Sequence, residues 1–149
     1  MSAVDKASNI IKPIIHGLES LSAVADLGIR LWVAWVFWKS GQTKIANWDS
    51  TLFLFEDYYS VPVLSPEAAA YLGTAVELSM PVLLAVGLAA RFGAVVLLLF
   101  NIVAVLSLPE LRAVDVQNHT LWGLMLLVTL FHGPGKWSID HLVRQRFWG

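Results

Sequence analysis

Apolar residues dominate four stretches of the chain, and polar or proline-containing segments separate them. The stretches run over about 21–38, 71–88, 92–108 and 116–131. A helix needs roughly 17–25 residues to cross the hydrocarbon core of a bilayer, and each stretch is close to that length. The pattern therefore predicts an all-α integral membrane protein, a four-helix bundle formed by a single domain that spans residues 1–149.

Two shorter segments also show helical spacing. Residues 1–20 place their isoleucines and leucines along one helical face, which predicts a helix lying on the membrane surface. In the long loop 39–70, Asp49 and Ser50 can cap a short amphipathic helix that includes residues 52–55. The polar segment 132–149 is expected to form a cytoplasmic tail.

Composition supports a membrane protein and excludes several other classes. Hydrophobic residues make up 57% of the chain and charged residues 14%, whereas soluble domains have roughly 45–50% and about 25%. The net charge is −1 with no basic run, so nucleic acid is not an expected partner. Cysteine is absent, and the histidines lack the spacing of a metal site, so no metal or haem is expected.

The distribution of basic residues predicts the orientation. Lysine and arginine concentrate in the cytoplasmic flanks of membrane proteins. With the N-terminus inside, the basic residues of the inner flanks are Lys6, Lys12, Arg91, Lys136, Arg144 and Arg146. The outer loops hold fewer basic residues and more acidic ones. We expect both termini in the cytoplasm, which requires an even number of spans.

Polar side chains inside the apolar stretches are the candidates for a functional site, because such residues are costly in hydrocarbon. At about 1.5 Å rise per residue, Arg30 lies at the midpoint of its span, and Glu77 and Asn101 lie slightly outward. His119 lies in the outer part of the fourth span. These depths predict that the four side chains share one layer, with Arg30 and Glu77 as an ion pair and Asp26 supporting Arg30 from one helical turn away.

Each candidate also has a purely structural interpretation. Asp26, Arg30 and Glu77 would then form an ion-pair network that sets the register of the helices. Asn101 would make an interhelical hydrogen bond, and His119 would cap a helix or contact solvent. Trp35 and Trp38 fit an interfacial aromatic belt as well as a pocket for a flat ring.

Three stretches of the chain carry a resemblance to a known family. They are Phe37–Lys44 (FWKSGQTK), Glu77–Arg91 (ELSMPVLLAVGLAAR) and Gly133–Asp140 (GPGKWSID), and Arg30 precedes them in the first span. Together they resemble the DoxX family of small four-helix membrane proteins. The resemblance implies a multi-pass protein of the bacterial inner membrane. The family name comes from a membrane subunit of a thiosulfate:quinone oxidoreductase, and other members are linked to redox or thiol stress.

The resemblance and the buried polar residues together suggest an accessory membrane subunit of a quinone-linked redox system. The chain would have no redox centre of its own, and without cysteine any sulfur chemistry would need a partner or the substrate. Quinone is the expected cofactor. The catalytic candidates are Glu77 for proton transfer and His119. The ligand-binding candidates are Arg30, Asn101, Trp35 and Trp38.

Two other functions remain open. The chain can instead be a structural or assembly subunit, in which the aromatic loop 48–59 docks another membrane or periplasmic protein. Transport of a small anion past Arg30 is a third function. It is disfavoured because the sequence has no internal repeat and no visibly broken helix except near Pro81.

Overall fold

A computed structural model describes residues 3–108 and 112–148, and these residues form six helices and no strand. The helices are α1 (Ala3–Ala46), α2 (Trp48–Asp57), α3 (Pro66–Val86), α4 (Ala90–Ser107), α5 (Ala113–His132) and α6 (Ile139–Trp148). The prediction of an all-α chain is confirmed.

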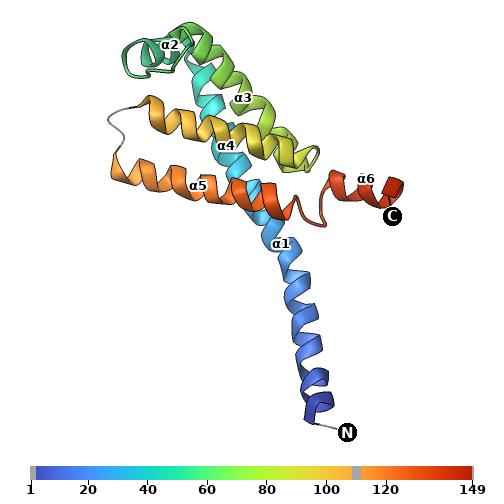
Figure 1. Cartoon of the computed structure of the whole chain (residues 1–149). Coiled ribbons are helices and arrows are strands. Elements are labelled where there is room, and N and C mark those ends of the chain that lie inside the picture. The colour runs from blue at the N-terminus through green and yellow to red at the C-terminus, as the bar shows by residue number, and fades with distance from the viewer. Residues whose placement is uncertain (1–2, 109–111, 149) are drawn as a thin grey trace.

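Four of the helices pack around one core. α1 lies against α3 and α5, while α4 packs between α3 and α5 (Figure 1). The core between them consists of aliphatic side chains and one phenylalanine, with Val33, Phe37, Leu84, Leu97 and Leu126 among its buried members. α2 packs across one end of α3. We call this the α2 end of the bundle, and the opposite end, with residues 87–89 between α3 and α4, the turn end.

Three of the helices are long and apolar enough to cross a membrane: Ile11–Ala46 within α1, Pro66–Val86 and Ala90–Ser107. They contain or closely match the first three predicted spans. The predicted fourth span lies within α5, which has 20 residues. Its first two turns contain Asp115, Gln117 and Asn118, and these lower its hydropathy.

The structure differs from the predicted separation of an interfacial helix at 1–20 and a span at 21–38. α1 is one helix of 44 residues, about 66 Å long at 1.5 Å per residue. No turn-forming pair of residues interrupts it, and Pro13 lies within its first three turns. The N-terminal part of α1 projects away from the other helices (Figure 1). Its side chains Ile11, Ile14 and Leu18 are exposed.

The short helix predicted in the 39–70 loop exists, but its start differs. α2 begins after Asn47, whose side-chain oxygen accepts a hydrogen bond from the Ser50 backbone nitrogen at 3.1 Å. The N-cap residue is therefore Asn47, and the prediction of Asp49 and Ser50 as caps is wrong. Thr51 and Phe55 form the buried face of α2.

Candidate functional site

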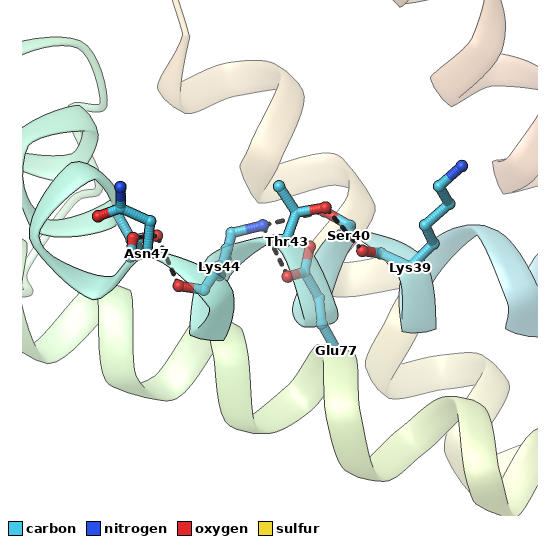
Figure 2. Close-up of polar contacts among 7 residues, drawn as sticks. Lys39, Ser40, Thr43, Lys44, Asn47 and Glu77 are labelled. Carbon is cyan, nitrogen blue, oxygen red and sulfur yellow. Dashed lines mark hydrogen bonds and ion pairs between the residues drawn. The ribbon is translucent and has the colours of Figure 1, made fainter.

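Glu77 pairs with Lys44 near the α2 end of the bundle. The Lys44 Nζ atom lies 2.6 Å from Glu77 Oε2 and donates a second hydrogen bond to Ser40 Oγ at 3.0 Å (Figure 2). The Glu77 side chain is 4% exposed and that of Lys44 is 18% exposed. The pair is therefore largely removed from solvent, so each charge depends on the other for compensation.

Gly41 allows α1 and α3 to approach closely enough for this pair. A Cβ atom at Gly41 would lie 2.9 Å from Leu78 Cδ2 and 3.0 Å from Glu77 Cβ. Any larger side chain would push the helices apart. Glycine at this position thus follows from helix packing, and residues 39–46 of the predicted loop belong to α1.

The predicted Arg30–Glu77 ion pair is not formed. Arg30 is buried, and its guanidinium donates hydrogen bonds to the backbone carbonyl of Pro134 and, at 2.7 Å, to that of Trp137. The reason is the length of α1, because the helix continues to Ala46 and not to residue 38. Lys44 lies fourteen residues beyond Arg30, about 21 Å along the axis, and reaches the level of Glu77 in its place.

Asp26 also has a different partner from the one predicted. Its Oδ1 lies 3.0 Å from His132 Nδ1, at the C-terminus of α5. Asp26, Arg30 and Glu77 therefore take part in three separate contacts, and they do not form a single network. The last residue of α5 supplies the partner of Asp26, and the segment after α5 supplies the partners of Arg30.

The same segment closes the turn end of the bundle. Asp140 accepts hydrogen bonds from the backbone nitrogens of Ala89 and Ala90, at 2.8 and 2.9 Å, at the start of α4. The Asp140 backbone nitrogen in turn donates to the Gly87 carbonyl at 2.8 Å. The GPGKWSID stretch is thus a folded connection against the bundle, and the predicted polar tail of residues 132–149 contains this connection and α6.

Asn101 on α4 and His119 on α5 do meet. Asn101 Nδ2 donates to the His119 carbonyl oxygen at 2.9 Å, and Asn101 Oδ1 lies 2.7 Å from His119 Nδ1. Because the amide nitrogen faces a carbonyl, the amide oxygen must face Nδ1, and Nδ1 must carry the proton. In the neutral ring, Nε2 is then the acceptor. The ring packs edge-on against Trp122, with the centroids 4.9 Å apart.

A cavity of about 600 Å³ lies at the α2 end, between α1, α3, α4 and α5. Glu77, Lys44, Ser40 and His119 contribute polar groups to its wall. The rest of the wall is mainly apolar, and its aromatic members are Phe37, Phe55, Tyr59, Phe100 and Trp122. Two candidate catalytic residues, Glu77 and His119, therefore line one cavity.

The other predicted ligand-binding residues lie elsewhere. Trp35 and Trp38 line a separate, smaller depression beside Pro81 and Val82, and Trp35 is largely exposed. Arg30 contacts the 134–137 segment, and Asn101 reaches the large cavity only through His119. The four residues therefore do not share one layer. Arg30 lies toward the turn end, whereas Glu77, His119 and Asn101 lie at or beside the cavity.

Sequence reasoning missed Lys44, Ser40 and Tyr59. The available signal was the i,i+4 spacing of Ser40 and Lys44, which puts both on one face if the helix continues. Tyr59 stacks on Phe55, with ring centroids 4.9 Å apart. Burial, and then the negative charge of Glu77, raise the pKa of the Tyr59 phenol above its usual value, so the phenol stays protonated at neutral pH.

A protein-family model described as DoxX matches residues 25–109. The chain belongs to the DoxX family. The DoxX match includes Arg30, Lys44, Glu77 and Asn101, while His119 and the Arg30-binding carbonyls lie beyond it. Comparisons with curated proteins and with solved structures gave no match. Among residues 3–108 and 112–148, no group of three or more potential ligands is placed to hold a metal ion.

Proposed function

We propose that this DoxX protein binds a quinone in the cavity at the α2 end and serves as a membrane subunit of a quinone-linked redox system. The observation that carries the proposal is the buried Lys44–Glu77 pair in the wall of an otherwise apolar and aromatic cavity. Ligand sites typically combine apolar walls with a few convergent polar groups. A flat ring with two oxygens fits such a site.

In this proposal, each polar residue of the cavity has its own role in ligand binding or proton transfer. Lys44 donates a hydrogen bond to one ring oxygen, and Glu77 exchanges a proton with the ligand or with Lys44. His119 Nε2 accepts a hydrogen bond from a ring hydroxyl, because Asn101 occupies Nδ1. The quinone supplies the redox chemistry, and electrons come from a partner protein because this chain contains no residue that carries them stably. Arg30 has a structural role in this proposal.

The proposed topology has four spans, with both termini in the cytoplasm of a bacterial cell. α5 supports this, because its 20 residues extend about 30 Å and it packs along α4. The basic residues at the turn end, which include Arg91 and Lys136, favour a cytoplasmic location there.

Single-cysteine labelling tests this topology directly, because the natural chain has no cysteine. Asn9→Cys and Gln145→Cys should be shielded from a membrane-impermeant maleimide in intact cells, and Ser60→Cys should react. Reaction of Gln145→Cys in intact cells, with Asn9→Cys protected, would show an odd number of spans.

The quinone site is tested by equilibrium binding of menaquinone to the protein in nanodiscs, followed by quenching of tryptophan fluorescence. Glu77→Gln and Lys44→Met should each weaken binding by about tenfold, the effect of roughly 1.4 kcal/mol. Glu67→Gln, in the exposed first turn of α3, is the matched control and should bind as the wild type does. Unchanged affinity in both cavity variants would rule out this site.

The alternative function is a non-catalytic assembly subunit. It is supported by the exposed outer face of α2, where Phe53, Leu54 and Tyr58 are exposed. Phe53→Ser with Tyr58→Ser should then release a partner that co-purifies with the wild-type protein. Substitutions of Glu77 should lower the amount of protein without lowering turnover per molecule. Retention of the partner by the double variant would exclude docking through this face.

A further inference from the structure

α3 and α4 separate from one another toward the α2 end. At the turn end, a Cβ atom on Gly93 would lie 3.4 Å from the Met80 carbonyl oxygen, so the two backbones nearly touch there. Nearer the α2 end, the three atoms closest to a Cβ on Gly73 all belong to side chains, with Phe100 first at 3.3 Å. Figure 1 shows the two helices diverging from their connecting turn.

The cavity occupies this divergence and reaches the surface through it. Leu72 on α3 and Leu99 and Val103 on α4 line the cavity, yet they are 55%, 59% and 40% exposed. Side chains that both line a cavity and remain exposed mark its opening. Since α3 and α4 are both candidate membrane spans, we expect this opening to face the hydrocarbon of the bilayer.

The chemical character of the cavity changes from its wall to its opening. The buried end holds Glu77, and Lys44 reaches it from α1. At the opening, the cavity wall is formed in part by α4, and none of the α4 residues that line the cavity is charged. A ligand that matches this gradient has a polar ring at one end and a long apolar chain at the other.

We infer that the site takes a membrane-dissolved lipid quinone, which enters sideways between α3 and α4. Its ring lies beside Lys44 and Glu77, and its tail leaves through the groove between Leu72 and Leu99. This inference rests on the proposed quinone site. It adds that the tail contributes to binding and that the ligand comes from the bilayer and not from water.

The experiment compares two ligands with the same ring: menaquinone with its prenyl tail, and menadione, which lacks the tail. Both are titrated against the protein in nanodiscs. Leu99→Trp fills the opening with a larger side chain. Leu121→Trp is the matched control, because Leu121 is 48% exposed on α5 and does not line the cavity.

Leu99→Trp should weaken menaquinone binding by about tenfold and leave menadione binding within twofold of the wild type, while Leu121→Trp changes neither. Unchanged menaquinone binding in Leu99→Trp would overturn the inference. So would equal loss of both ligands, because the groove would then hold the ring. If the wild type binds menadione as tightly as menaquinone, the tail inference fails but the quinone site stands. If it binds neither, both fail.

Discussion

Asn101 and His119 hold each other through two hydrogen bonds that run in opposite directions between α4 and α5. The amide nitrogen of Asn101 donates to the backbone of His119, and the amide oxygen accepts from its ring. One side chain thus fixes both the position of α5 and the tautomer of His119. His119 Nε2 is left as an acceptor because Nδ1 donates its proton to Asn101 on α4.

Replacement of Asn101 should allow the His119 ring to adopt the other tautomer. In Asn101→Ala, nitrogen NMR of histidine-labelled protein should show His119 moving toward the Nε2-protonated form. Interhelical hydrogen bonds in membranes contribute about 0.6 to 1.7 kcal/mol, so the free energy of unfolding should fall by roughly 1 kcal/mol. Asn118→Ala, at the exposed neighbouring position, is the control. An unchanged His119 spectrum would contradict the assigned tautomer.

Loss of Lys44 should be more harmful than loss of the whole Lys44–Glu77 pair. Lys44→Met leaves a buried carboxylate without compensation, which costs about 3–5 kcal/mol, whereas removing both charges costs much less. The free energy of unfolding in mixed micelles should therefore recover in Lys44→Met with Glu77→Gln. Lys39→Met, on the same helix with an exposed side chain, controls for the general effect of losing a lysine. Equal destabilisation by the single and double variants would disprove the coupling.

Arg30→Lys should loosen the connection between α5 and α6. The planar guanidinium reaches two carbonyls, those of Pro134 and Trp137, and an ammonium cannot reproduce this geometry. Hydrogen exchange in residues 133–138 should become faster, while exchange in α3 stays slow. Arg112→Lys, at an exposed arginine paired with Asp115, should leave the exchange of this segment unaltered. Faster exchange throughout the bundle would indicate global unfolding and contradict a local role of Arg30 in holding this segment.

Replacement of Ala89 by glycine should stabilise the protein. It has φ +47°, in the left-handed region where an L side chain costs roughly 1–2 kcal/mol. Ala89→Gly should therefore raise the free energy of unfolding by about 1 kcal/mol, less the entropy that glycine adds to the unfolded chain. Ala90→Gly, one residue later in helical conformation, should have the opposite sign. Destabilisation by both substitutions would show that residue 89 is not strained.

The pKa of the Tyr59 phenol should depend on the charge of Glu77. Burial and then this charge raise the pKa of Tyr59, so Glu77→Gln should lower the Tyr59 pKa, as followed by ultraviolet titration. The sign for stability follows from the raised folded-state pKa. The phenol's contribution is complete below the unfolded value of about 10 and is lost as pH rises through the folded value. Glu67→Gln should leave the titration of Tyr59 as it is, and an equal shift in both variants would exclude a local effect of Glu77.

The sequence alone determined the class of the protein and the residues worth examining. Apolar runs of about eighteen residues require helices, because a bilayer offers no partner for free backbone groups. Polar residues within those runs had to be buried, and Arg30, Glu77 and Asn101 are. The motifs resembled the DoxX family, and the family match over residues 25–109 covers the first two of them.

Only the tertiary structure decided which polar residues meet. The choice between Arg30 and Lys44 as the partner of Glu77 depends on where α1 ends. The two candidates lie fourteen residues apart on α1, about 21 Å along the axis. No local signal marks the continuation, since Gly41 reads as a loop residue until α3 is packed against it. Helix register is set by such packing between distant segments, and local sequence does not encode it.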